Sequence, residues 1–227
     1  MKQLINVAIV IGFFTGSFAQ ALTTTVITKT PKSAVQSPAE QAEVDTMDEL
    51  DPFDPNIEEK LQAIDEDYEA ETGKSSHLFS LPILRGANFA AKYSCVRAAC
   101  PVWIQVVKST QIAYLYIDGG LEATWKVSSG MAGHSTPNFD THPNGRVYDA
   151  YSSKKFPGGD YQGLGNMPYA VFISGGFALH GTPKGNWSKL GTKASHGCIR
   201  MHPENAQYFN QLVRQYGVDQ VWITVQP

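Results

Sequence analysis

The sequence divides into two parts of opposite charge, and only the second has the composition of a folded domain. Residues 22–74 contain fourteen acidic residues and four lysines, a net charge of −10, whereas residues 75–227 contain seven acidic residues and thirteen lysines and arginines, a net charge of +6. The stretch 23–41 is rich in Pro, Ser, Ala and Gln and cannot bury enough apolar surface to fold. The sequence therefore predicts an acidic, largely disordered tether over residues 22–80, followed by one cored domain over residues 81–227.

One part of the acidic segment has the spacing of a helix. Ile57, Leu61 and Ile64 recur at intervals of four and three residues, which predicts a short amphipathic helix around residues 55–68. So short a helix is expected to be marginal and loosely docked. The acidic segment could act as a tether through a crowded polymer or could lie against the basic domain, and the sequence leaves both open.

The N-terminus has the features of a secretory signal peptide over residues 1–21. Lys2 supplies a positive charge, residues 4–14 form an apolar run too short to span a bilayer, and residues 19–21 offer a small-residue cleavage pattern. The mature chain is expected to begin near Leu22, outside the cytoplasm, with no transmembrane segment after cleavage.

The second part of the chain predicts a mainly β fold with minor α. Apolar or alternating runs predict strands over residues 103–107, 112–117, 121–127, 170–173, 177–179 and 221–225. One helix is expected over residues 203–217, because a proline suits its first position, apolar residues recur at helical spacing and a glycine follows. Residues 131–166 are rich in Gly, Pro, Asn, Asp and Ser and are expected to form long loops.

The segment with the clearest chemistry is Ser195-His196-Gly197-Cys198-Ile199-Arg200. A thiol with an ordinary pKa of about 8.5 is mostly protonated at neutral pH, and a neighbouring imidazole shifts it toward the reactive thiolate. Cys198 is therefore a candidate nucleophile. His180 is a candidate base, and the adjacent His196 is an alternative that sequence geometry does not exclude.

The other two cysteines are Cys95 and Cys100. An oxidising compartment would permit them to close a small loop, which would leave Cys198 as the reduced thiol. The alternative is that both are small buried residues.

Residues 103–225 resemble the catalytic domain of the L,D-transpeptidases, the YkuD-like enzymes of bacterial peptidoglycan. The family signature begins with a histidine, which is followed after fourteen to seventeen residues by Ser or Thr. The sequence His-Gly-Cys comes next, then an apolar residue and usually Asn or Arg. In this sequence, fourteen residues separate His180 from Ser195. Supporting resemblances lie at residues 127–130, 141–146, 167–170 and 177–181. The resemblance implies an L,D-transpeptidase-like β-sandwich or barrel carrying one helix in the C-terminal region.

The resemblance also implies roles for the residues of the motif. Cys198 would be the nucleophile and His180 the proton acceptor and donor, with the backbone carbonyl of Gly181 holding the imidazole. The backbone amides around His196, Gly197 and Cys198 would form an oxyanion hole.

Further residues would support this site. Ser195 would stabilise the turn, and Arg200 would either orient a stem-peptide carboxylate or donate to loop carbonyls. Tyr169 and Trp187 are expected to line the substrate groove. His134, in a polar stretch, is expected to face solvent.

The implied reaction is acyl transfer on a peptidoglycan stem peptide. Cys198 would attack the carbonyl between meso-diaminopimelate and the terminal D-alanine of a tetrapeptide, release D-alanine and pass the acyl group to an amine. The product would be a 3–3 cross-link, an exchanged D-amino acid or an amine-bearing protein attached to the wall, in the periplasm or cell wall. No metal, organic cofactor or nucleic acid is expected, since thiol and imidazole supply nucleophile and proton shuttle.

Three alternatives remain. Water in place of the amine would make the protein an L,D-carboxypeptidase. An inert Cys198 would leave a non-catalytic wall-binding module. His180, His196, Cys198 and His202 could instead bind a metal, although the usual paired ligand spacings are absent from the sequence.

Overall fold

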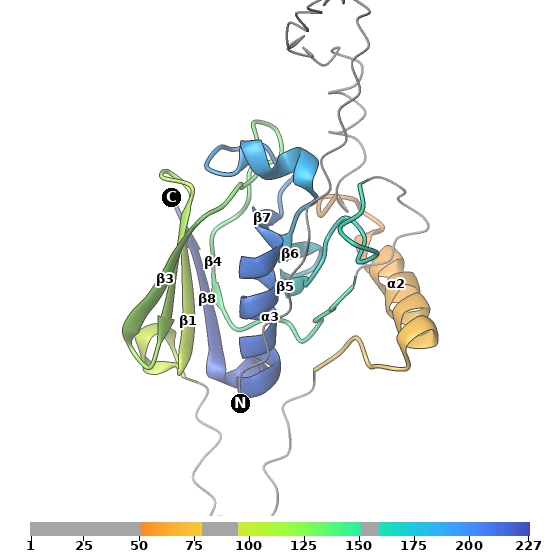
Figure 1. Cartoon of the computed structure of the whole chain (residues 1–227), viewed down its shortest axis with the longest axis horizontal. Coiled ribbons are helices and arrows are strands. Elements are labelled where there is room, and N and C mark those ends of the chain that lie inside the picture. Colours follow the sequence, from red (N-terminus) through yellow and green to blue (C-terminus); the bar gives the residue numbers. More distant parts are fainter. Residues whose placement is uncertain (1–50, 79–94, 151–158) are drawn as a thin grey trace, which may run out of the picture. The chain divides into compact units, whose positions relative to one another are not determined.

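The computed structural model describes residues 51–78, 95–150 and 159–227 (Figure 1). The predicted signal peptide and the polar stretch 23–41 lie outside these residues, so both stay predictions. Among the described residues, no helix combines the length and the apolar character needed to cross a membrane.

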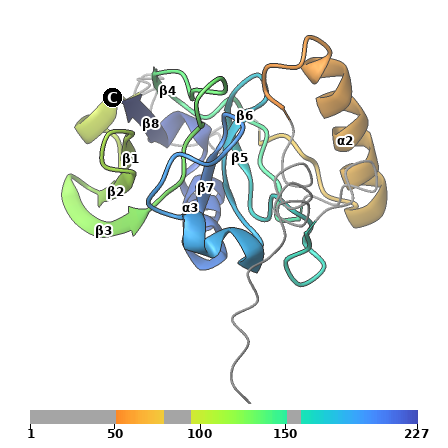
Figure 2. The ribbon, with the colours of Figure 1, turned by 90° about the horizontal axis from the view of Figure 1, so that it is seen from above.

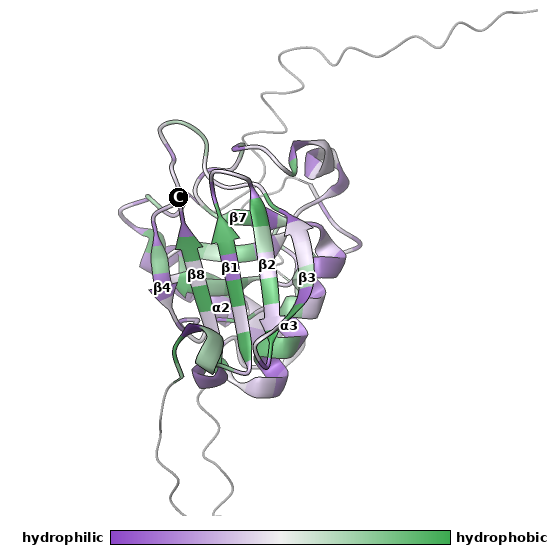
Figure 3. Cartoon of the chain, turned by 90° about the vertical axis from the view of Figure 1, so that its left-hand side faces the viewer, coloured by the Kyte–Doolittle hydropathy of each residue, from purple (hydrophilic) through white to green (hydrophobic). Residues whose placement is uncertain are grey.

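A five-stranded sheet forms one side of the core (Figure 3). Its order is β3-β2-β1-β8-β4, and all neighbours are antiparallel except β1 and β8, which run parallel. The strands are β1 (Val102–Val107), β2 (Ile112–Ile117), β3 (Gly120–Lys126), β4 (Phe139–Thr141) and β8 (Val221–Gln226). Val102, Ile104 and Val106 are buried while the residues between them are partly exposed, as expected for a sheet with one face on a core.

A three-stranded sheet forms the second layer. It has the order β5-β6-β7, with β5 (Val171–Ser174) antiparallel to β6 (Phe177–Gly181) and β6 parallel to β7 (Ile199–Met201). Because side chains alternate along a strand, the sheet serves two cores. Leu179 and Ile199 belong to the main core, whereas Ala178 and Cys198 belong to a second apolar cluster.

The helix α3 (Pro203–Tyr216) completes the main core. It begins with a proline at its first turn and ends at Gly217, and the buried side chains of Ala206, Phe209 and Val213 lie at helical spacing. These side chains share one cluster with residues of both sheets. The predicted mainly β fold with one helix in the C-terminal region is therefore confirmed.

Two strands were not predicted from the sequence. β4 lies in the stretch expected to be loop, and β7 lies within the cysteine motif. Each has three residues, too few to show a period, and each exists because a longer neighbour pairs with it: β8 for β4 and β6 for β7.

The helix α2 (Ile57–Thr72) is the helix expected around residues 55–68, and it extends four residues further. Its docking differs from the loose contact expected, because Leu61, Ile64 and Tyr68 are buried in the second cluster. It lies on the side of β5–β7 away from the five-stranded sheet (Figure 2). Of the two alternatives for the acidic segment, this part lies against the basic domain; the division at residues 22–80 and 81–227 stays a prediction.

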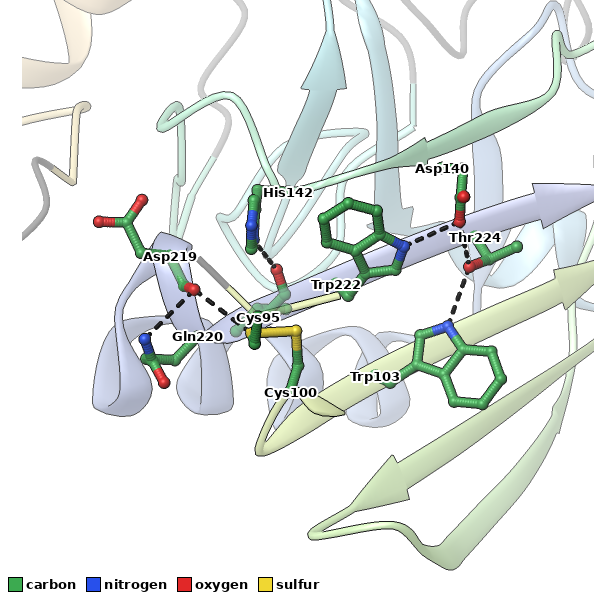
Figure 4. The surroundings of a disulfide bond; sticks show 10 residues. Cys95, Cys100, Trp103, Asp140, His142, Asp219, Gln220, Trp222 and Thr224 are labelled. Atoms are coloured by element: carbon green, nitrogen blue, oxygen red, sulfur yellow. Dashed lines mark hydrogen bonds between the residues drawn. A yellow bond between two sulfur atoms is a disulfide. The ribbon is translucent and has the colours of Figure 1, made fainter. Parts of the chain in front are cut away.

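Cys95 and Cys100 form a disulfide that closes the short helix η1 (Arg97–Ala99) (Figure 4). Arg97 at its start forms an ion pair with Asp140 of β4, at 2.6 Å. The hydrogen bond from this guanidinium, assisted by the ring nitrogen of Trp222 and the hydroxyl of Thr224, lowers the pKa of Asp140 to about 2. The ion pair thereby attaches the loop closed by the disulfide to β4, an edge strand of the sheet.

Candidate active site

The parallel pairing of β6 with β7 brings His180 and Cys198 together. His180 lies opposite Arg200 in the ladder, and Cys198 precedes Arg200 by two residues, so the side chains of His180 and Cys198 point to the same face of the sheet. Neither residue has exposed surface. The Cys198 Sγ donates to the carbonyl oxygen of Gly176, at 3.4 Å, in the turn between β5 and β6.

The imidazole of His180 is held by the residue that follows it. Its Nδ1 lies 2.7 Å from the carbonyl oxygen of Gly181, which is the contact that the family resemblance implied. A proton on Nδ1 donated to this carbonyl makes Nε2 the basic nitrogen. Position 181 favours glycine because a Cβ there would lie 2.9 Å from the Cα of Pro203 and 3.0 Å from the Cγ of Pro168.

Hydrogen bonds from Ser195 hold the turn that presents Cys198. The Ser195 hydroxyl donates to the carbonyl of Cys198 at 2.6 Å and accepts the amide of Gly197 at 3.2 Å. Gly197 has a φ of +127°, a conformation that side chains rarely allow. The predicted support of the turn by Ser195 is therefore present, and one of the three amides expected in the oxyanion hole is directed at Ser195.

Thr136 is a residue of this site that the sequence reasoning missed. Its buried hydroxyl accepts the amide of Gly130 at 2.8 Å and donates to the carbonyl of Gly197 at 2.7 Å. Gly130 itself bridges to Ser195, so the two chain segments are joined beside the nucleophile. Thr136 lies in a polar, proline-containing loop, and no sequence signal distinguishes it from its neighbours.

Arg200 is fully buried, and its Nη1 donates to the carbonyl of Ala194 at 2.8 Å. This contact is of the kind expected for a structural donor to a loop carbonyl. His196 is partly exposed, and its ring lies edge-to-face against that of His134 with the centroids 5.2 Å apart. His134, expected to face solvent, is partly exposed.

The two predicted groove residues contact other parts of the domain. Trp187 lies in the short helix η2 (Lys184–Lys189), donates to the carbonyl of Thr182 at 2.9 Å and packs against the ring of His202. Tyr169 packs against the main core, not the cluster that contains Cys198, and partial burial raises its pKa. Their contact with a substrate stays a prediction. Within the described ranges, no three His, Cys, Asp or Glu side chains are grouped as metal ligands.

The chain belongs to the YkuD family of L,D-transpeptidase catalytic domains. The family model matches residues 101–223, which is more than half of the chain and includes every strand except β8 in full, as well as His180 and Cys198. No curated protein matches the sequence significantly.

Solved structures of similar proteins carry the same family description. They include an L,D-transpeptidase from Mycobacterium smegmatis (21% identity, 57% of this chain and 60% of that chain, TM-score 0.46). Others are an L,D-transpeptidase from Stackebrandtia nassauensis (20% identity, 61% of each chain, TM-score 0.44) and L,D-transpeptidase 3 from Mycobacterium tuberculosis with a faropenem-derived adduct (24% identity, 57% and 61%, TM-score 0.42). The chain spans about three fifths of the length of these proteins.

Proposed function

We propose that this protein is a cysteine-dependent L,D-transpeptidase in which Cys198 attacks the bond between meso-diaminopimelate and D-alanine of a stem tetrapeptide. The observation that carries the proposal is the arrangement of His180 and Cys198. The two side chains lie on one face of a parallel strand pair, and the Gly181 carbonyl fixes the imidazole in the tautomer that can accept a proton at Nε2.

In the acylation half-reaction, the Nε2 of His180 takes the thiol proton of Cys198, and the thiolate attacks the substrate carbonyl. Backbone amides of the turn between Ser195 and Cys198 stabilise the oxyanion. When the C–N bond breaks, the imidazolium of His180 returns its proton to the departing D-alanine amine, and a thioester remains on Cys198.

In the second half-reaction, an amine attacks the thioester, His180 takes the amine proton, and the thiol of Cys198 leaves with a proton returned by the imidazole. The acceptor determines whether the product is a 3–3 cross-link, an exchanged D-amino acid or a wall-attached protein. With water as acceptor the same steps give an L,D-carboxypeptidase. A periplasmic or cell-wall location, reached through the predicted signal peptide, would bring the domain to these substrates.

The test is incubation of the purified protein with wall material and with a tetrapeptide, followed by mass spectrometry of the products. We expect D-alanine release by the wild type and none by Cys198→Ala, with equal thermal unfolding of the two proteins. Cross-linked dimer, exchanged monomer, protein adduct or tripeptide would identify the acceptor. Appreciable D-alanine release by Cys198→Ala would contradict the mechanism.

A further inference from the structure

The proposed nucleophile is not accessible in this structure. Cys198 and His180 have no exposed surface, although an acyl-transfer site must admit a peptide carbonyl to the thiol and an amine to the thioester. The residues that cover the site therefore bear directly on how it works.

The residues over the cysteine turn come from the segment that precedes α2. A Cβ built on Gly197 would lie 2.7 Å from the Cγ of Pro52 and 3.0 Å from Cε2 of Phe53. The ring of Phe53 also lies edge-to-face on that of Phe177, with the centroids 5.2 Å apart. Pro52 and Phe53 are thus in close contact with the turn that holds Cys198.

The start of α2 packs against the turn that accepts the hydrogen bond of the thiol. A Cβ on Gly176 would lie 2.6 Å from Cγ1 of Ile57 and 2.9 Å from the Cα of Pro52. The carbonyl of Gly176 is the acceptor for Cys198 Sγ. One turn further along, Leu61 and then Ile64 enter the apolar cluster that contains Cys198.

A few polar contacts hold this segment on the domain. Arg146 forms ion pairs with Glu58 at 2.9 Å and Asp65 at 3.2 Å, and Asp65 also accepts a hydrogen bond from Tyr148. The Glu58 side chain is 65% exposed, and Phe53 is 47% exposed. These two exposed contacts contribute little to docking, whereas the Asp65–Arg146 pair is largely buried, the side chains of Leu61, Ile64 and Tyr68 are buried, and together they contribute most of it. Because these side chains belong to the second cluster, the segment can separate from the domain while the main core stays intact.

The segment is attached more firmly after α2 than before it. The helix ends at Gly73, and residues 76–78 then pair with the domain through the amide of Leu78 to the carbonyl of Gly145 and the amide of Val147 to the carbonyl of Ser76. Movement of the helix about residues 73–75 would leave this pairing in place.

We propose that residues 51–72, here called the cover, form an autoinhibitory element that occupies the substrate face over Cys198 and must be displaced before a stem peptide binds. The proposal rests on the proposed role of Cys198. It assigns the acidic segment a regulatory function, since a partner or wall polymer that draws the cover away would switch the enzyme on.

The test measures alkylation of Cys198 by iodoacetamide in the full chain under non-reducing conditions. Because the other two cysteines form the disulfide, intact mass reports this thiol alone. In the variant Phe53→Ala/Ile57→Ala, we expect the rate to rise at least about tenfold, the change given by about 1.4 kcal/mol of lost docking free energy. Leu121→Ala, at an exposed position on β3, is the control and should label like the wild type.

A second pair of variants tests the ion pair between Glu58 and Arg146. Both substituted positions are exposed, so we expect the variants to fold. Glu58→Arg places like charges beside Arg146, whereas Glu59→Arg makes the same charge change on an exposed neighbouring residue of α2. We expect about threefold faster labelling for Glu58→Arg, the order that the loss of an exposed ion pair gives, and no change for Glu59→Arg.

Equal labelling rates of the wild type, Phe53→Ala/Ile57→Ala and Glu58→Arg would overturn the proposal that the cover blocks the site. A wild-type labelling rate equal to that of a small-molecule thiol would overturn it as well. D-Alanine release from a tetrapeptide is measured on the same samples. Faster labelling of the variants without D-alanine release would support the role of the cover and contradict the proposed function. D-alanine release at an unchanged labelling rate would support the proposed function and contradict the role of the cover.

Discussion

Thr136 provides a sharp test of how the cysteine turn is held. Its hydroxyl is the partner of two buried backbone groups, the amide of Gly130 and the carbonyl of Gly197. Thr136→Val keeps the shape of the side chain and removes both hydrogen bonds. Each buried polar group left without a partner costs about 1–3 kcal/mol, so we expect the variant to lose about 2–6 kcal/mol of unfolding free energy.

Thr136→Val should also slow catalysis more than its stability loss explains. The carbonyl of Gly197 and the amide of Cys198 belong to one planar peptide group, so fixing the carbonyl fixes the direction of the amide proposed for the oxyanion hole. Loss of one oxyanion donor costs about 100-fold to 1000-fold in kcat, and a misdirected donor should cost at least about tenfold.

Urea unfolding and D-alanine release from a tetrapeptide measure the two effects, both at a temperature where the variant is folded. Thr136→Ser restores the hydroxyl and should recover kcat, a rescue that general loss of packing would not give. Thr124→Val, on the exposed side of β3, is the matched control. If the unfolding free energy of Thr136→Val lies within about 0.5 kcal/mol of the wild-type value and its kcat is unchanged, the reasoning is wrong.

Two other predictions follow from charges and protons in the structure. The pKa of Asp140, about 2, lies below that of an unfolded aspartate, so the carboxylate stabilises the fold above pH 4, and this stabilisation is lost as the pH falls toward 2. With its side chain 38% exposed, Asp140→Asn should cost about 1 kcal/mol at pH 7 and nothing below pH 2, by urea unfolding. His180→Gln should reduce kcat for D-alanine release by about 100-fold or more, as expected for loss of a general base.

Each of these has a control. For Asp140, a stability difference that persists unchanged at pH 2 would show that packing and not charge is responsible. For His180, the matched variant is His142→Gln, because His142 bonds to the carbonyl of Val221 in the five-stranded sheet. Equal losses of kcat in the two histidine variants would count against His180 as the base.

The sequence predicted the elements whose residues have a clear period or a clear stop signal. The strand pair 112–117 and 121–127 and the helix from Pro203 correspond to β2, β3 and α3 within one or two residues. The short strand β7 was missed because its pairing with β6 is decided by residues outside the local segment. The disulfide, left open by the sequence, required knowledge of where Cys95 and Cys100 lie in the fold.

The candidate site divides in the same way. Cys198, His180 and Gly181 were predicted as site residues from the motif, because the chemistry of a thiol and an imidazole depends on residue type. Thr136 was missed because a hydroxyl in a polar loop is unremarkable until the fold places it beside Gly197.

By itself, the sequence determined the family, the mainly β composition of the domain and the candidate nucleophile and base, since all three follow from residue types at fixed spacing. The tertiary structure alone decided that α2 packs over the face that carries Cys198 and that Arg146 holds it there. The physical reason is that burial and ion pairing join residues more than eighty positions apart, such as Asp65 and Arg146, and a local pattern contains no information about such pairs.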